Sequence, residues 1–158
     1  MPTSQRTKDV VRDLWTIGAK YGRTPDPTPE ADPWDDGDPL DEPRDEAVVV
    51  FRGLPDVQVH LYGDSEDTVT IEQCVDFETS RSETVALVAA ILAGDAQIGL
   101  LGGRWRFVRD WLQPFYGMQL VIPVAGHEPY RQRVPYQPLQ RWLETLRAAP
   151  SAPGPRAS

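Results

Sequence analysis

The sequence predicts an α+β fold, an antiparallel sheet of five to six strands with helices packed on one face, together with an N-terminal helix and an acidic linker. Three observations predict this fold. Short β-branched runs separated by turn residues indicate antiparallel strands, an apolar segment at 80–95 indicates a covering helix, and a Pro-rich acidic stretch at 24–46 favours neither. The length of 158 residues, with 40% hydrophobic residues, is enough for one folded domain with tails.

The chain divides into four expected parts: an amphipathic helix at 1–23, a linker at 24–46, an α+β domain at 47–148 and a disordered tail at 149–158. In the first part, Val10, Leu14, Ile17 and Tyr21 recur at helical spacing, and Gly22 is a natural terminator. The apolar face of this helix packs either on its own domain or in the groove of a partner.

The linker at 24–46 holds six prolines and ten acidic residues against one Arg. Proline removes backbone donors and neighbouring carboxylates repel one another, so neither a helix nor a sheet is favoured. We therefore expect a semi-extended tether in this region.

The body opens with three predicted strands, at 47–52, 57–62 and 68–75. Alternation predicts that each strand has one apolar and one polar face, as in an antiparallel meander. His60 falls on the polar face, where a hairpin centred near residue 65 or 66 would place Thr70 or Glu72 opposite it. A His–Glu pair could serve acid–base chemistry, but on exposed sheets such pairs more commonly have no catalytic role.

The second half alternates helices and strands. Ser80 and Glu83 have the spacing of a capping box, and Gly94 closes the helix that they begin. A hairpin is expected around Gly102-Gly103, joining 96–101 to 104–111, and the next strand ends near Pro123. The pattern at 130–136 fits a strand or a loop. A final helix at 137–148 is predicted to bury Leu139, Trp142, Leu143 and Leu146.

The net charge of −8 hides a strong division along the chain. Residues 24–103 sum to −16, whereas residues 104–141 sum to +4. General repulsion of phosphate disfavours nucleic acid as a ligand, and no apolar run approaches the length of a membrane span. The N-terminal stretch lacks the apolar core of a secretory signal, so a cytoplasmic location is expected.

The stretch 32–42 is the most unusual segment of the chain. The stretch does not fit a calcium-binding EF-hand loop. When Gly37 is aligned with the glycine at position 6 of that loop, Trp34 and Pro43 fall at positions 3 and 12, where oxygen ligands are needed. As a docking segment it offers two apolar side chains among carboxylates, with the predicted partner-binding residues Trp34, Asp35, Asp36, Asp38, Leu40, Asp41 and Glu42. Alternatively Trp34 packs back on its own protein.

A third hypothesis has the acidic segment fold back on the arginines of the second half. The possible anion-binding residues are Arg104, Arg106, Arg109, Arg131 and Arg133. Such a latch would be salt-sensitive, because exposed ion pairs are weak individually.

The sequence carries no recognised catalytic or phosphate-binding motif, and we predict no enzyme activity, no cofactor and no metal site. Its two histidines, His60 and His127, and its single cysteine, Cys74, form no pattern of a reactive site; the cysteine is expected to be a small buried filler.

These observations favour a non-catalytic protein-binding protein, similar in charge and size to immunity proteins or inhibitors, whose acidic surface engages a cationic partner. Two alternatives stay open: an adaptor or structural subunit of a larger bacterial assembly, and a small-ligand-binding or enzyme domain using His60, Glu72 and the arginines. The oligomeric state is not predicted.

Overall fold

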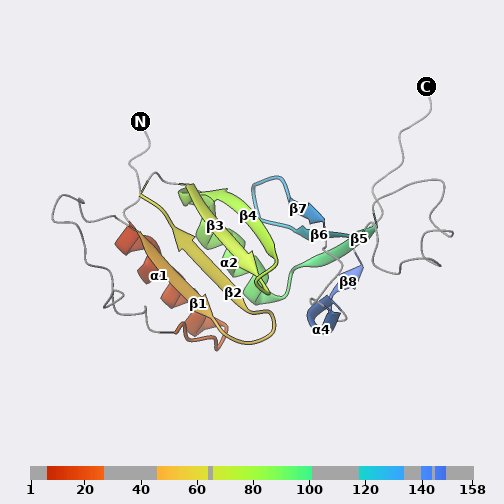
Figure 1. The fold of residues 1–158 in the computed structure, drawn as a ribbon, viewed down its shortest axis with the longest axis horizontal. Helices are drawn as coiled ribbons and strands as arrows, with labels where there is room; N and C mark the ends of the chain where they lie inside the picture. Colours follow the sequence, from red (N-terminus) through yellow and green to blue (C-terminus); the bar gives the residue numbers. More distant parts are fainter. Residues whose placement is uncertain are drawn as a thin grey trace, which may run out of the picture.

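The computed structural model describes residues 7–26, 46–63, 66–100, 118–133, 140–143 and 145–148. Its elements are α1 (Thr7–Lys20), β1 (Ala47–Phe51), β2 (Val57–Leu61), β3 (Glu66–Ile71), β4 (Val75–Ser80), α2 (Arg81–Ala93), β5 (Gln97–Leu100), β6 (Met118–Ile122), β7 (Tyr130–Arg133), α4 (Gln140–Leu143) and β8 (Arg147–Ala148). The fold is α+β, as predicted. Instead of the single predicted sheet of five to six strands, the strands within these ranges form two four-stranded sheets, sheet A in the order β1-β2-β3-β4 and sheet B in the order β7-β6-β5-β8 (Figure 1).

Sheet A is an antiparallel meander in which each strand pairs with the next along the chain. Its fourth strand, β4, is missing from the sequence prediction, which ran a single strand through 68–75. The chain instead turns at Glu72 and Gln73, whose φ angles of 52° and 57° both lie in the left-handed region. Such turns usually carry Asn-Gly, so the pair Glu-Gln gave no turn signal.

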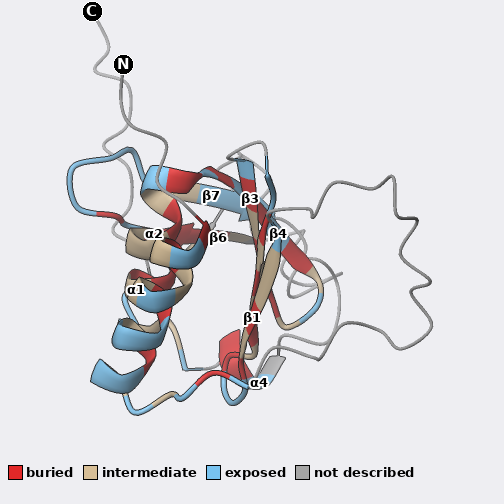
Figure 2. Ribbon diagram, turned by 90° about the vertical axis from the view of Figure 1, so that its left-hand side faces the viewer, coloured by how far each residue is buried: buried red, intermediate tan, exposed pale blue. Residues whose placement is uncertain are grey.

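The predicted alternation is confirmed in sheet A. β2 and β3 alternate between buried and less buried residues along their length. Both α1 and α2 lie on the same side of the sheet, where the buried residues point (Figure 2). The core between them contains Val49, Phe51, Val59, Leu61, Val69, Ile71, Phe77, Leu87 and Ile91, together with Val10 and Leu14 of α1.

The N-terminal helix α1 packs on its own domain, against α2 and β1. Val10 and Leu14 are fully buried, whereas Trp15 is 40% exposed. A Cβ on Gly18 would lie 2.3 Å from the Arg23 carbonyl oxygen and 2.8 Å from Phe51 Cε1, so only glycine allows this close approach. After α1 the chain returns along β1, and the Asp26 N–H donates to the Val50 carbonyl at 2.8 Å.

Helix α2 occupies most of its predicted range, and Gly94 caps its C-terminus with φ 80°. The predicted capping box is wrong. Ser80 stands at the N-cap without a side-chain cap bond, and its hydroxyl pairs with the Ser82 hydroxyl at 3.1 Å. None of the described helices has the length and apolar character that crossing a membrane would require.

Sheet B corrects one further prediction, the extent of the final helix. β5 pairs antiparallel with β6 and parallel with β8. The hairpin expected around Gly102-Gly103 is not tested, because it and the strand at 104–111 lie outside the described residues. The final helix is short, because Arg147 and Ala148 form β8 rather than continuing α4. Trp142 and Leu143 are buried, as predicted, and Leu146 packs against the core. Strand β6 ends before Pro123, also as predicted.

Candidate functional site

The outer face of sheet A is the side opposite α1 and α2, and none of the described helices packs on it. The strand register places its residues in two rows across the sheet. One row runs Val48, His60, Thr68, Glu78, and the other runs Val50, Gln58, Thr70, Asp76. Along these two rows the face therefore changes from Val at β1, through Gln, His and Thr at β2 and β3, to acidic residues at β4.

Within the strands, the exposed charged residues on this outer face are all acidic. Glu66, Asp76 and Glu78 are exposed, and no Lys or Arg occurs in β1 to β4. The Thr70 hydroxyl donates to Asp76 Oδ1 at 2.7 Å, which orients one of these carboxylates. We call the outer face formed by these two rows and Glu66 the acidic face.

Two aromatic rings stand on the acidic face. His60 and Tyr62 are stacked, with ring centroids 6.1 Å apart and planes 22° apart, and Tyr62 is 39% exposed. The predicted pairing of His60 with Thr70 or Glu72 is wrong, because His60 lies opposite Thr68. Its Nε2 atom is 2.6 Å from Gln58 Nε2, and Glu72 instead accepts the Asp56 N–H at 2.9 Å in the turn after β3.

A buried ion pair lies beneath the end of the acidic face. Arg81 and Asp67 are 5% and 1% exposed, and Arg81 Nε lies 2.9 Å from both carboxylate oxygens of Asp67. Neighbouring groups add further hydrogen bonds to the pair. Thr84 Oγ1 donates to Asp67 at 2.7 Å, and Arg81 donates to the Thr7 hydroxyl and to the Tyr62 carbonyl. Charges buried in this way need such complete pairing.

A second polar cluster joins the two sheets. The Tyr130 hydroxyl donates to Glu83 Oε2 and lies 2.8 Å from Thr79 Oγ1, and His127 Nδ1 lies 3.1 Å from Glu83 Oε1. Burial raises the pKa of Tyr130, and the hydrogen bond to Glu83 raises it further. The phenol therefore stays protonated and acts as a donor that ties β7 to the first turn of α2.

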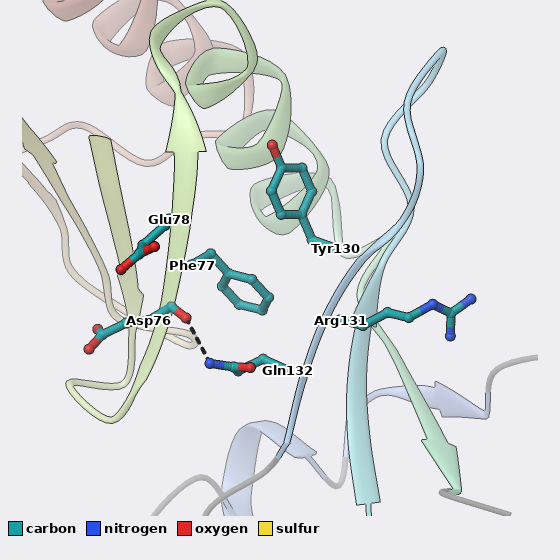
Figure 3. Close-up of a pocket in the computed structure, with 6 residues that line it drawn as sticks. All are labelled: Asp76, Phe77, Glu78, Tyr130, Arg131 and Gln132. Atoms are coloured by element: carbon teal, nitrogen blue, oxygen red, sulfur yellow. Dashed lines mark hydrogen bonds between the residues drawn. The ribbon is translucent and has the colours of Figure 1, made fainter. Parts of the chain in front are cut away.

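Between β4 and β7 lies a cleft of about 370 Å³ lined by Asp76, Phe77, Glu78, Tyr130, Arg131 and Gln132. Figure 3 shows that the carboxylates of Asp76 and Glu78 point away from it, as does the Arg131 side chain. Gln132 reaches across, and its Nε2 donates to the Asp76 carbonyl at 3.3 Å. The charged side chains of this cleft thus diverge, so they do not converge on one point as the groups of a catalytic centre do.

The two described members of the arginine set, Arg131 and Arg133, are both exposed and share one face of β7, since they are two residues apart. Arg104, Arg106 and Arg109 lie outside the described residues, as do the predicted partner-binding residues between Trp34 and Glu42. The structure therefore places none of the acidic segment relative to the arginines.

Within the described ranges, no group of three or more His, Cys, Asp or Glu residues is arranged to hold a metal ion. Cys74 is half-buried in the turn before β4, and burial raises the pKa of its thiol, with Glu72 and Asp76 adding to the effect. A thiol whose pKa is raised is a poor nucleophile at neutral pH. This environment fits the expected role of Cys74 as a filler.

Sequence reasoning missed two features of this region: the Arg81–Asp67 pair and the Glu83–Tyr130 contact. One signal was available, because Asp67 shares the parity of Val69 and Ile71 and so had to lie on the buried face. A charged residue at such a position requires a buried partner. No family model, curated protein or solved structure shows a significant match to this chain.

Proposed function

We propose that this chain is a non-catalytic cytoplasmic protein whose acidic face binds a cationic partner protein. The observation that carries the proposal is a sheet face without a covering helix among the described residues, bearing exposed carboxylates and no basic residue within its strands. Electrostatic complementarity of this kind speeds association and selects partners by charge.

The graded composition of the acidic face supports a protein rather than a small ion as ligand. Protein interfaces combine apolar and aromatic contacts with a charged rim. Here Val48 and Val50 lie at one edge, Tyr62 at one end, and Asp76 and Glu78 at the opposite edge. A partner covering this face would meet all three kinds of contact.

The acidic segment before β1 extends the proposal. In sequence it leads through Glu46 into β1, and it adds Trp34 and Leu40 as apolar residues among carboxylates. A basic nuclease or toxin, with a positive active cleft to be covered, is the class of partner that this charge layout suits best, in the manner of immunity proteins and inhibitors.

Charge reversal on the acidic face tests the proposal against a matched control. Asp76→Lys/Glu78→Lys changes the net charge by the same amount as Asp95→Lys/Glu128→Lys, whose two exposed carboxylates lie beyond sheet A. We expect wild type to retain basic proteins from a lysate at low salt and to release them at high salt. The first variant should lose about tenfold or more of this retention, and the control about threefold or less.

Equal losses in the two variants would show that only bulk charge matters. Retention that does not change with salt would contradict an electrostatic interface altogether. The contribution of the preceding segment is measured separately by Trp34→Ala and by deletion of residues 27–45, both of which we expect to weaken retention.

A further inference from the structure

Tyr62 differs from the other exposed large apolar side chains of the described residues. Three such side chains are present: Trp15, Leu54 and Tyr62, with exposed fractions of 40%, 52% and 39%. Trp15 lies on α1 and Leu54 in the turn after β1, whereas Tyr62 directly follows β2 at the end of the acidic face. It is the one of the three that lies on the acidic face.

The backbone of Tyr62 is held on both sides by the buried ion pair. Its N–H donates to Asp67 Oδ1 at 3.4 Å, and its carbonyl accepts a hydrogen bond from Arg81 Nη2. Both partners are themselves fixed, since their side chains are almost fully buried and paired with each other. Because the backbone is already fixed, binding through this side chain carries little additional cost of ordering the main chain. The Arg81–Asp67 pair thus fixes the position of Tyr62, although the pair itself is buried and does not contact the partner protein.

The surroundings of the ring favour a cation. His60 stacks against it, and continuing the β2–β3 register places Glu66 opposite Tyr62 at the start of β3. The face of an aromatic ring attracts positive charge, and a nearby carboxylate accepts hydrogen bonds from it. Arginine suits this combination better than lysine, because a planar guanidinium stacks on a ring while its N–H groups reach a carboxylate.

We propose that Tyr62 and Glu66 form a subsite for an arginine side chain of the partner protein, held in place by the Arg81–Asp67 pair. This inference rests on the proposed function, since it names the group of a cationic partner that the acidic face recognises.

Two peptides that differ only in their cation test it: one with Arg at every second position separated by Ser, and its counterpart with Lys. Binding to the full chain is measured by calorimetry at low salt. We expect the Arg peptide to bind wild type about five- to tenfold tighter than the Lys peptide. Tyr62→Leu should lower the affinity for the Arg peptide by about the same factor and remove the difference between the peptides, whereas Tyr62→Phe should keep it.

Trp15→Leu is the matched control, because it removes an aromatic ring of equal exposure from another surface. Neither peptide should bind this variant differently from wild type. A preference for Arg that persists in Tyr62→Leu, or that is absent from wild type, overturns the subsite. If both peptides bind equally and Asp76→Lys/Glu78→Lys weakens both, the subsite fails while the proposed function stands. If neither peptide binds wild type, both proposals fail.

Discussion

Two arginines of this protein make ion pairs in opposite surroundings. Arg81 pairs with Asp67 where the two side chains are 6% and 0% exposed, and three further polar groups complete the arrangement. Arg52 pairs with Asp26 and Asp56 at similar distances of 2.9 and 3.0 Å, but its own side chain is 61% exposed. The contact distances are alike, but Arg81 is shielded from water and Arg52 is exposed to it.

This difference teaches that distance alone does not rank ion pairs. In water-accessible positions, hydration of the separated charges offsets most of the attraction. In the interior, a charge that loses its partner cannot recover hydration, so the pair becomes a requirement of the fold. The Glu83–Tyr130 contact is intermediate, since both side chains are half-buried.

The largest effect is expected from breaking the buried pair on one side. Arg81→Met leaves the Asp67 carboxylate buried without its partner, and we expect a loss of about 3–5 kcal/mol in the free energy of unfolding, measured with urea. The double variant Arg81→Met/Asp67→Leu removes both charges and should recover part of that loss. A single variant that loses less than about 1 kcal/mol would show that water reaches the pair.

Breaking the half-buried Glu83–Tyr130 contact should lower the free energy of unfolding by an intermediate amount that depends on pH. Tyr130→Phe is expected to cost about 1–2 kcal/mol near neutral pH, because the Glu83 carboxylate and the Thr79 hydroxyl lose a partner. Since folding raises the pKa of Tyr130, its contribution is complete below the pKa of an unfolded tyrosine, about 10, and is lost as the pH rises through the folded value.

Urea unfolding of wild type and Tyr130→Phe at neutral pH and above pH 10 measures both quantities. The gap in stability between the two proteins should narrow in alkali. Tyr62→Phe, which removes an exposed hydroxyl, is the control and should change stability by less than about 0.5 kcal/mol. A gap that is constant across this pH range would mean that the Tyr130 proton is not linked to folding.

The smallest effect is expected at Arg52. Its carboxylate partners raise its pKa, the hydrogen bond to Asp26 first, but an arginine does not titrate in the range where the protein folds, so no pH dependence follows. Arg52→Gln should change the melting temperature by no more than about two to four degrees, and by less in high salt.

Arg23→Gln sharpens this comparison, because Arg23 lies in the same part of the molecule. Arg23 donates to the backbone carbonyls of Phe51, Arg52 and Pro55 at 3.2, 2.9 and 2.6 Å, and so ties the end of α1 to the β1–β2 turn. We expect a larger fall in melting temperature than for Arg52→Gln. Equal effects would mean that exposure does not separate the two arginines.

The prediction from local sequence pattern was most accurate for elements that can be recognised from their own residues alone. The apolar run of α2, its terminating Gly94 and the alternating parity of β2 all follow from side chains near in sequence. Prediction failed where two conformations fit the local pattern equally well. The turn at Glu72 and Gln73 carries no glycine or asparagine, so the predicted strand ran through it to Val75 and the rest of β4 was not predicted.

The candidate site shows the same limit. The excess of acid in the first half and the polar parity of Gln58 and His60 could be read from the sequence. The Ser80–Glu83 spacing was misread as a capping box, because Glu83 finds a stronger donor in Tyr130, 47 residues away. No local rule indicates a partner at that distance.

By itself, the sequence determined the α+β class, the apolar face of each strand in the first half of the body, the position of α2 and the division of charge along the chain. Side-chain periodicity and composition are local quantities, and they decide which surface must leave water. The tertiary structure alone decided that the strands form two sheets, that α1 covers its own domain, and that Asp67 meets Arg81 beneath Tyr62. Those outcomes depend on which segments pack together, and hence on contacts between residues far apart in the chain.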